Sequence, residues 1–309
     1  MPAPLSVLLG LALLLGGATA LVWGAASASL RLGLTPLVIG ATVVAFGTSA
    51  PELVVSVDAA LGGAGGIAVG NVVGSNIANV ALILGVAALV RPVPTEAAIL
   101  RRDLPVLMVA TLGAGAVLWD GAVGRPEGAA LVGALVASLA WSVRAGRAEA
   151  QAAVDGVPDR PAGSAAANAL AVVAGLGALV LGARWLVAGA TTLAEAAGVP
   201  NAVIGLTVVA LGTSLPELAT STVAAVRGDS AIAAGNVVGS NLFNVLGILG
   251  VAALVHPFAA PGLRAADVAA MVGVTALAWA LMWSGRRVGR LEGGALVGLY
   301  AVYIATLVG

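Results

Sequence analysis

The chain has 309 residues, of which 60% are hydrophobic and only 9% are charged, and its formal net charge at pH 7 is zero. Soluble domains carry charge on about a quarter of their residues, so this composition excludes an ordinary soluble domain and indicates an integral membrane protein. Because there is no cysteine and only one histidine, thiolate metal sites, disulfides and multi-histidine centres are excluded. The sequence has no basic patch that would indicate a nucleic acid partner.

Apolar runs long enough to cross a bilayer, about 20 residues each, recur from end to end. Runs of this length fit helices, because barrel strands alternate polar and apolar residues in short segments. The first run lacks the positive region of a cleaved signal, so we expect it to be retained as a helix. The sequence predicts an all-α integral membrane fold with ten transmembrane helices, at residues 5–25, 35–61, 67–90, 104–120, 127–144, 168–190, 200–226, 231–255, 266–284 and 291–308.

One long stretch of the chain occurs twice. Residues 38–92 align without a gap with residues 203–257, and each residue of the second copy lies 165 positions after its counterpart. The first copy contains GTSAPEL and GNVVGSNIAN, and the second contains GTSLPEL and GNVVGSNLFN. Weaker similarity at the same offset relates residues 13–25 to residues 178–190. The repeated unit is therefore five helices.

An odd number of helices makes the second unit enter the membrane from the opposite side, so we expect two inverted five-helix repeats, as in many secondary transporters. They would occupy residues 1–143 and 167–309. The segment 144–166 between them is charged, contains prolines and is short, which is typical of a linker.

The distribution of arginine predicts the orientation, since the chain has no lysine. If both termini lie outside, 11 of the 14 arginines face the cytoplasm, as the positive-inside rule requires. These are Arg31, Arg91, Arg101, Arg102, Arg144, Arg147, Arg160, Arg227, Arg286, Arg287 and Arg290. We therefore expect a multi-pass protein of the inner (plasma) membrane with both termini outside and the linker in the cytoplasm.

Glu52 and Glu217 occupy equivalent positions deep in apolar sequence. A lone carboxylate there costs about 3 kcal/mol or more, so it must be protonated, paired or bound to a cation. Neither glutamate has a lysine or arginine near it in its own helix. One such glutamate could be a protonated structural residue, but two that are related by a repeat, each in the same polar motif, indicate a cation site.

The residues around the glutamates supply further oxygen ligands. Pro51 and Pro216 free backbone carbonyls about one turn upstream, and such carbonyls can bind a cation where they line a cavity. Hydroxyls stand beside them at Thr48, Ser49, Thr213 and Ser214. In the second motif Ser75 and Asn79 share one helix face, and Ser240 and Asn244 repeat the arrangement. These are all hard oxygen donors, of which Ca²⁺ takes about six to eight, and Na⁺ accepts the same donors.

At these motifs the chain resembles the cation/calcium antiporter superfamily and, within it, the prokaryotic sodium/calcium exchangers. The resemblance implies ion sites between helices two, three, seven and eight, with Glu52 and Glu217 binding Ca²⁺ at the centre together with Thr48 and Thr213. It also implies flanking sodium sites and a completed ligand cluster, formed by Ser49, Ser75, Ser214, Ser240, Asn79, Asn244 and the carbonyls of Ala45 and Ala210.

The chain departs from several relatives at Asn244, where these carry aspartate, among them potassium-coupled members. Asparagine lowers the charge of the site by one and argues against potassium coupling. The GTS-x-PE motif also matches sodium-coupled members better than calcium/proton exchangers, whose glutamate usually stands in a GNATE-like motif.

We therefore expect a secondary active antiporter that exchanges Na⁺ for Ca²⁺ by alternating access, electrogenic and independent of K⁺. It would be no enzyme, would need no cofactor besides the transported ions, and would work as a monomer in the bilayer. The alternatives are Ca²⁺/H⁺ or other cation antiport on the same fold, a channel between the inverted halves, and an intramembrane hydrolase. The hydrolase would need a water-activating pair of acids without this surrounding cage of Ser, Thr and Asn.

The orientation can be tested by single-cysteine labelling in this cysteine-free chain. We expect Asp155→Cys, in the linker, to be protected from a membrane-impermeant thiol reagent added to intact cells. Asp120→Cys, at the outer end of the fourth predicted helix, should be labelled in the same experiment. Labelling of residue 155 from outside would overturn the orientation.

Overall fold

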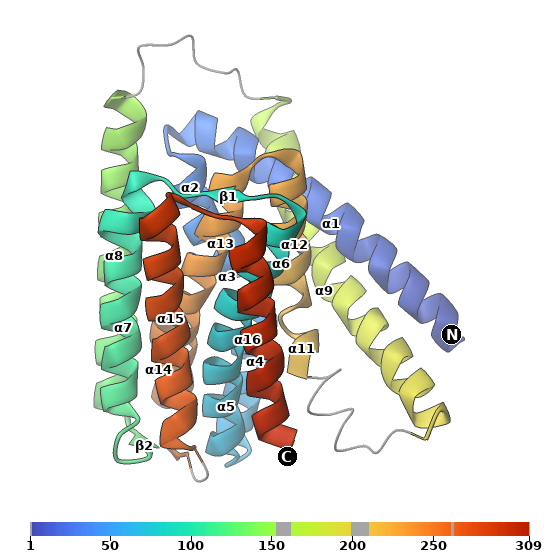
Figure 1. Cartoon of the computed structure of the whole chain (residues 1–309), viewed down its shortest axis with the longest axis vertical. Helices are drawn as coiled ribbons and strands as arrows, with labels where there is room; N and C mark the ends of the chain where they lie inside the picture. The colour runs from blue at the N-terminus through green and yellow to red at the C-terminus, as the bar shows by residue number, and fades with distance from the viewer. Residues whose placement is uncertain (1, 153–161, 199–209, 261–262, 309) are drawn as a thin grey trace.

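A computed structural model describes residues 2–152, 162–198, 210–260 and 263–308 of the chain, and these residues are almost entirely helical (Figure 1). Six of the described helices are long and apolar enough to cross a membrane, and a bent pair of helices would add a seventh. The all-α membrane class is therefore confirmed. The count of ten helices stays a prediction, because much of the predicted helix at 200–226 lies outside the described residues.

The first half of the chain contains long helices interrupted by π-helical segments, labelled η, and two very short strands. In order, its elements are α1 (Ala3–Leu32), α2 (Pro36–Ile39), η1 (Gly40–Val44), α3 (Ala45–Thr48), α4 (Ala50–Leu61), α5 (Gly65–Ile77), η2 (Ala78–Ile83), α6 (Leu84–Val90), β1 (Val93–Pro94), η3 (Ile99–Asp103), α7 (Leu104–Val117), β2 (Ala122–Val123) and α8 (Arg125–Ala152).

As far as it is described, the second half repeats this order except that α15 is α-helical where the first half has η3 and α7. Its elements are α9 (Ala165–Ala196), α11 (Ala210–Gly212), α12 (Leu215–Arg227), α13 (Ser230–Leu242), η5 (Phe243–Ile248), α14 (Leu249–Val255), β3 (Phe258–Ala259), α15 (Ala265–Gly285), β4 (Arg287–Val288) and α16 (Arg290–Val308).

The helix α8 extends well into the segment expected to be a linker, since it ends at Ala152 rather than near residue 144. Alanine-rich sequence with alternating charge favours helix even without an apolar face. A tertiary contact also stabilises the extension, because Glu149 forms an ion pair with the guanidinium of the buried Arg102 at 2.8 Å. Of the remaining linker, residues 153–161 lie outside the described part.

The two halves are inverted relative to one another where their elements can be compared. Strand β1 pairs with β4, and β2 pairs with β3, both antiparallel. By the repeat offset β3 is the counterpart of β1, and β4 is the counterpart of β2. In Figure 1 β1 lies at the top of the molecule and β2 at the bottom, so the two equivalent pairs close opposite ends. Each pair joins one strand from each half, which ties the loops of the two halves together.

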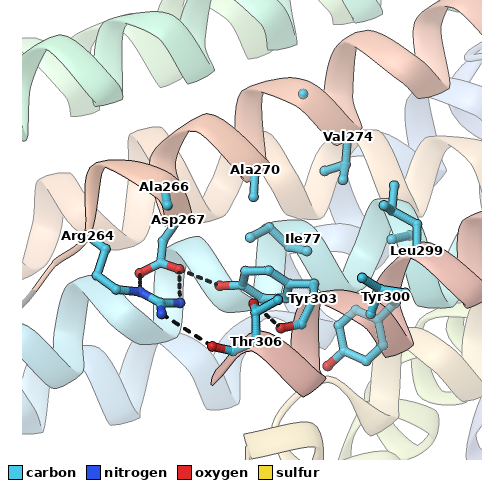
Figure 2. Close-up of a pocket in the computed structure, with 13 residues that line it drawn as sticks. Ile77, Arg264, Ala266, Asp267, Ala270, Val274, Leu299, Tyr300, Tyr303 and Thr306 are labelled. Carbon is cyan, nitrogen blue, oxygen red and sulfur yellow. Dashed lines mark hydrogen bonds and ion pairs between the residues drawn. The ribbon is translucent and has the colours of Figure 1, made fainter. Parts of the chain in front are cut away.

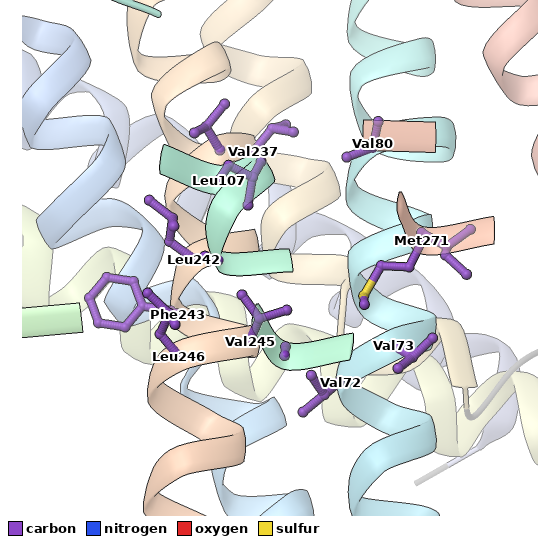
Figure 3. Packing of buried hydrophobic residues seen from close by; sticks show 14 of the residues in the cluster. Val72, Val73, Val80, Leu107, Val237, Leu242, Phe243, Val245, Leu246 and Met271 are labelled. Atoms are coloured by element: carbon purple, nitrogen blue, oxygen red, sulfur yellow. The ribbon is translucent and has the colours of Figure 1, made fainter. Parts of the chain in front are cut away.

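The motif-bearing helices α5 and α13, with their π-helical continuations η2 and η5, form the centre of the molecule. Apolar side chains from these elements, α7 and α15 pack together there, among them Val73, Val237, Val245 and Met271 (Figure 3). The central helices are far more buried than the others: in an apolar 18-residue stretch of each long helix, 78% of the residues are buried within 65–90 and 89% within 230–255, against 39% or less in the others. This rigid apolar centre holds the polar motifs away from lipid.

Helices α1 and α9 pack against each other along their length through glycines spaced seven residues apart. Gly10, Gly17 and Gly24 on α1 have Gly175, Gly182 and Gly189 as their repeat counterparts on α9. A Cβ on Gly17 would lie 2.8 Å from the carbonyl oxygen of Gly175, and a Cβ on Gly10 would lie 2.8 Å from that of Gly182. Small residues at this spacing let two helix backbones approach closely in lipid.

This packing predicts that Gly17→Ala destabilises the folded protein. The added methyl group meets backbone atoms that have no room to yield, and overpacking of this kind costs about 1–3 kcal/mol. We expect a lower midpoint of thermal unfolding in detergent. Gly16→Ala is the matched control, because a Cβ there meets nothing within 4 Å among the described residues. Equal effects of the two substitutions would contradict the close α1–α9 contact.

Candidate cation-binding site

Each of the two glutamates stands at the start of a helix that follows a break. The helical pair 36–48 and 50–61 bends by 47° at Ser49, and Glu52 lies in the first turn of α4. Glu217 lies in the first turn of α12, after the corresponding break at Ser214. The first turn of a helix carries unpaired N–H groups and the positive end of the helix dipole, which favours a carboxylate. The proline after each serine enforces the break.

Both carboxylates are buried without a basic partner. Glu52 and Glu217 are each 1% exposed. Within the described residues the ion pairs involve other groups, namely Arg102 with Asp103 and Glu149, and Arg264 with Asp267. Each accepts a hydrogen bond from the serine at the break before the other glutamate, which brings both carboxylates to one junction between the halves. Two close carboxylates in a membrane interior need a cation or a proton.

The two halves of the chain exchange hydroxyl groups across the site. The Ser49 hydroxyl donates to Glu217 Oε1 at 2.9 Å, and the Ser214 hydroxyl donates to Glu52 Oε1 at 3.1 Å. Each serine thus serves the glutamate of the other half. The site therefore exists only where the two repeats meet.

Two asparagines brace the helices that carry the glutamates. Asn71 Nδ2 donates to the backbone carbonyl of Glu52 at 3.1 Å and to the Ser56 hydroxyl at 2.9 Å. Asn236 makes the equivalent contacts, to the carbonyl of Glu217 at 3.5 Å and to the Ser221 hydroxyl at 2.9 Å. These bonds fix the first turns of α4 and α12 against α5 and α13.

Four more asparagines form a symmetric cluster across the repeats. Asn79 Nδ2 donates to Asn241 Oδ1 at 3.0 Å, and Asn244 Nδ2 donates to Asn76 Oδ1 at 2.9 Å. Asn76 and Asn241 also donate to each other's backbone carbonyls at 3.4 Å. Asn79 lies in η2 and Asn244 in η5. A π-helical turn shifts the register of the side chains after it, and such turns are frequent at functional sites.

The described residues leave a specific set of oxygens without a hydrogen-bond donor. Both glutamates use Oε1 and leave Oε2 without a partner, and both Asn79 and Asn244 use Nδ2 and leave Oδ1 without one. These four oxygens form two repeat-related pairs. Each can only accept a hydrogen bond, unless a carboxyl group is protonated. Buried acceptors of this kind are normally satisfied, and a cation bound among them would satisfy all four.

The other predicted ligands are placed as follows. The Thr48 hydroxyl lies 3.2 Å from Asn236 Oδ1 and 3.3 Å from the carbonyl of Ala45. That carbonyl also accepts the backbone N–H of Ser49 at 3.0 Å, so it has less freedom than the sequence suggested. The hydroxyls of Thr213 and Ser240 are buried without a partner among the described residues. Ser75 is buried.

Ala210 begins α11 directly after residues 199–209, and its surroundings lie outside what the structure describes. The sequence analysis did not single out Ser56 and Ser221, which receive the bracing asparagines. A signal for them was present, since they are identical residues at equivalent positions of the repeat, four places after each glutamate.

Comparison with known proteins finds relatives along most of the chain. The family model described as "Sodium/calcium exchanger protein" matches the chain twice, over residues 2–144 and 167–309. The inner membrane protein YrbG of Escherichia coli is 36% identical over 243 residues, which cover 76% of this chain and 75% of YrbG. CaxA of Alkalimonas amylolytica, which carries the name of an antiporter, is 37% identical over 244 residues and 75% of both chains.

A solved structure of the sodium-calcium exchanger NCX_Mj superposes on the whole molecule. Its TM-score is 0.87 at 32% sequence identity, and the match covers 99% of this chain and 98% of that one.

Proposed function

Because this chain belongs to the sodium/calcium exchanger family, we propose that it exchanges Na⁺ for Ca²⁺ across the membrane by alternating access. The observation that carries the proposal is the set of four buried acceptor oxygens, two carboxylate and two amide, that lack donors among the described residues. Hard oxygens of this kind, with serine and threonine hydroxyls beside them, are the ligands that Ca²⁺ prefers. The antiporter name of CaxA and the exchanger NCX_Mj support the same reading.

The charge of the site sets the coupling. Glu52 and Glu217 together contribute −2, which one Ca²⁺ neutralises. Two Na⁺ neutralise it equally, and a third Na⁺ leaves one excess positive charge. Exchange of three Na⁺ for one Ca²⁺ therefore moves net charge across the membrane and responds to the membrane potential. With asparagine at position 244 there is no third carboxylate to hold K⁺.

We further propose that the protein resides in the inner membrane, as the name of YrbG supports, with both termini outside. The described residues assemble the proposed ligands within one chain, so a monomer suffices for transport. The repeats at 1–143 and 167–309 would then rock about the central site, which each half completes for the other.

Flux measurements test the proposal directly. In proteoliposomes, an outward Na⁺ gradient should drive uptake of radioactive calcium, and Glu52→Gln and Glu217→Gln should each abolish it. Each substitution removes one formal charge, and a charge pair at 4 Å contributes about 4 kcal/mol at an effective dielectric near 20. Glu195→Gln, an exposed carboxylate near the end of α9, is the control and should transport normally.

Circular dichroism would verify that the glutamine variants remain folded. Wild-type-like exchange in either variant would refute the central site. Uptake driven by a proton gradient and indifferent to Na⁺ would replace sodium coupling by Ca²⁺/H⁺ antiport on the same ligands.

A second prediction concerns Asn244 and the coupling ions. With K⁺ replaced by choline, wild-type exchange should continue and should depend on a clamped potential. In Asn244→Asp the carboxylate would face the amide oxygen of Asn76, which now accepts from Asn244 Nδ2 at 2.9 Å. Two acceptors cannot bond without a proton, so we expect exchange by this variant to change steeply with pH. Asn79→Asp, its repeat counterpart, should behave alike.

Loss of wild-type flux without K⁺, or flux that ignores potential, would contradict the two-carboxylate argument. A pH profile of Asn244→Asp that superposes on that of the wild type would contradict the role assigned to the Asn244–Asn76 bond.

A further inference from the structure

A short motif that opens the fifth helix of each half occurs twice in the chain. It reads GRPEGAAL at residues 124–131 and GRLEGGAL at residues 289–296, at the repeat offset of 165. The motif starts α8 in the first half and α16 in the second. Its glutamate accepts the backbone N–H of its first glycine, Glu127 at 3.1 Å in the first copy and Glu292 in the second. The glutamate thus caps its own helix, whereas the arginine of the motif has partners elsewhere.

The arginine of each motif reaches into the other half of the chain. Arg125 Nε donates to the backbone carbonyl of Leu254, at the end of α14, at 3.2 Å. Arg290 Nε donates to the equivalent carbonyl, that of Leu89 at the end of α6, at 3.1 Å, and Arg290 Nη2 donates to the carbonyl of Val90 at 3.3 Å. The last carbonyls of a helix have no partner within the helix and form the negative end of its dipole, so a guanidinium binds them favourably.

The glycine after each glutamate brings the same helices into backbone contact. A Cβ on Gly128 would lie 2.7 Å from the carbonyl oxygen of Gly250 in α14, and a Cβ on Gly293 would lie 2.7 Å from that of Gly85 in α6. Because a side chain does not fit at either contact, α14 and α6 must each turn a glycine towards the fifth helix. The two contacts lie at opposite ends of the molecule, one beside the β2–β3 pair and the other beside the β1–β4 pair (Figure 1).

Each fifth helix is also fixed at its far end, to the fourth helix of its own half. On α16 the Tyr303 hydroxyl donates to Asp267 Oδ1, in the first turn of α15, at 3.3 Å (Figure 2). On α8 Glu149 pairs at 2.8 Å with Arg102, which lies in η3 directly before α7. Asp267 and Arg102 are repeat counterparts, so the two halves make this connection with different side chains. Since each fifth helix is held at both ends, it can hold the helix that it contacts.

The helices that the arginines hold continue directly from the π-helical turns that carry two proposed ion ligands. The N–H of Leu249 bonds the carbonyl of Asn244, five residues earlier, and the N–H of Leu84 bonds that of Asn79 in the same way. A π-helical turn contains one residue more than an α-helical turn. If α14 or α6 were released, the turn before it could relax to α-helical geometry, which would rotate the asparagine by about 100° relative to the helix after it.

We propose that Arg125 and Arg290 are positioning residues for the ion site, Arg125 acting through Asn244 and Arg290 acting through Asn79. Each arginine fixes the end of the helix after the π-helical turn, and the asparagine braces described above fix the helix before it. Held from both sides, the turn keeps its amide directed at the site. That these amides bind ions rests on the proposed function, whereas the effect of the arginines on the turns does not.

Hydrogen exchange measured by mass spectrometry tests the effect on the turns without any ion. In Arg125→Gln, hydrogen exchange of the backbone amides in η5 should become faster, because its π-type bonds open more often, and hydrogen exchange in η2 should not change. Arg290→Gln should give the reverse pattern. Faster exchange confined to the last turn of α14 or α6 would mean that the arginines only prevent fraying of the helix ends, and it would overturn the proposal.

A double-mutant cycle tests whether each arginine acts through its asparagine. We expect Arg125→Gln to weaken binding of Ca²⁺ to the detergent-solubilised protein about three- to tenfold, measured by calorimetry. In an Asn244→Ala background the same substitution should change the affinity less than about twofold. In an Asn79→Ala background it should keep its full effect. An arginine with a merely structural role would lower the affinity equally in both backgrounds.

Conservative variants and a matched control complete the design. Arg125→Lys keeps one charged donor for the one carbonyl that Arg125 contacts, so it should bind Ca²⁺ as the wild type does. Arg290→Lys loses the fork geometry that reaches two carbonyls and should restore only part of the affinity. Arg287→Gln removes an exposed arginine of β4 whose side chain makes no hydrogen bond among the described residues, and it should change neither hydrogen exchange nor binding.

These measurements separate the positioning role from the proposed function. If the wild type shows no Na⁺-driven Ca²⁺ flux but the hydrogen-exchange pattern and the cycle are as expected, the coupling is wrong and the positioning role stands. If flux is present but Arg125→Gln leaves hydrogen exchange in η5 unchanged, or the cycle is additive, the positioning role is wrong.

Discussion

Two carboxylates buried close together inside a membrane protein repel one another and lose the hydration that would stabilise them. Neutral groups of the chain partly stabilise Glu52 and Glu217. A break places each at a helix start, a serine from the opposite half donates to one oxygen, and an asparagine fixes the turn behind it. What remains uncompensated is one oxygen on each carboxylate and one on each of two amides. A cation that bound only the assembled site, as we propose, would stabilise the contact between the two halves.

Much of the candidate site could be predicted from the sequence because the motifs that contain its residues occur twice. The duplicated GTS-x-PE and GNVVGSN motifs indicated Glu52, Glu217 and the flanking Ser, Thr and Asn residues, and the bends at Ser49 and Ser214 follow from the prolines beside them. The strand pairs display the inversion that the predicted five-helix repeat implied, since equivalent strands lie at opposite ends of the molecule.

The rest depends on tertiary contacts that no local pattern specifies. Nothing in the spacing of Asn76, Asn79, Asn241 and Asn244 shows that each amide bonds across to the other half. The π-helical turns η2 and η5, which hold Asn79 and Asn244, have no compositional signature and arise from packing at the centre. The helical extension of α8 to Ala152 was missed because its stabilising partner, Arg102, is distant in sequence.

The reciprocal bonds Ser49–Glu217 and Ser214–Glu52 bear on how such a molecule can arise. Each half of the chain carries a glutamate and a serine, and each serine donates to the glutamate of the other half. A half-length chain could therefore build this site only as a pair of oppositely inserted copies, which requires a polypeptide with dual topology and no strong arginine bias. Fusion of two such copies removes that requirement, and each half is then free to acquire its own charges. The aspartate at position 267 opposite the arginine at position 102 is a difference of this kind, available only to the fused chain.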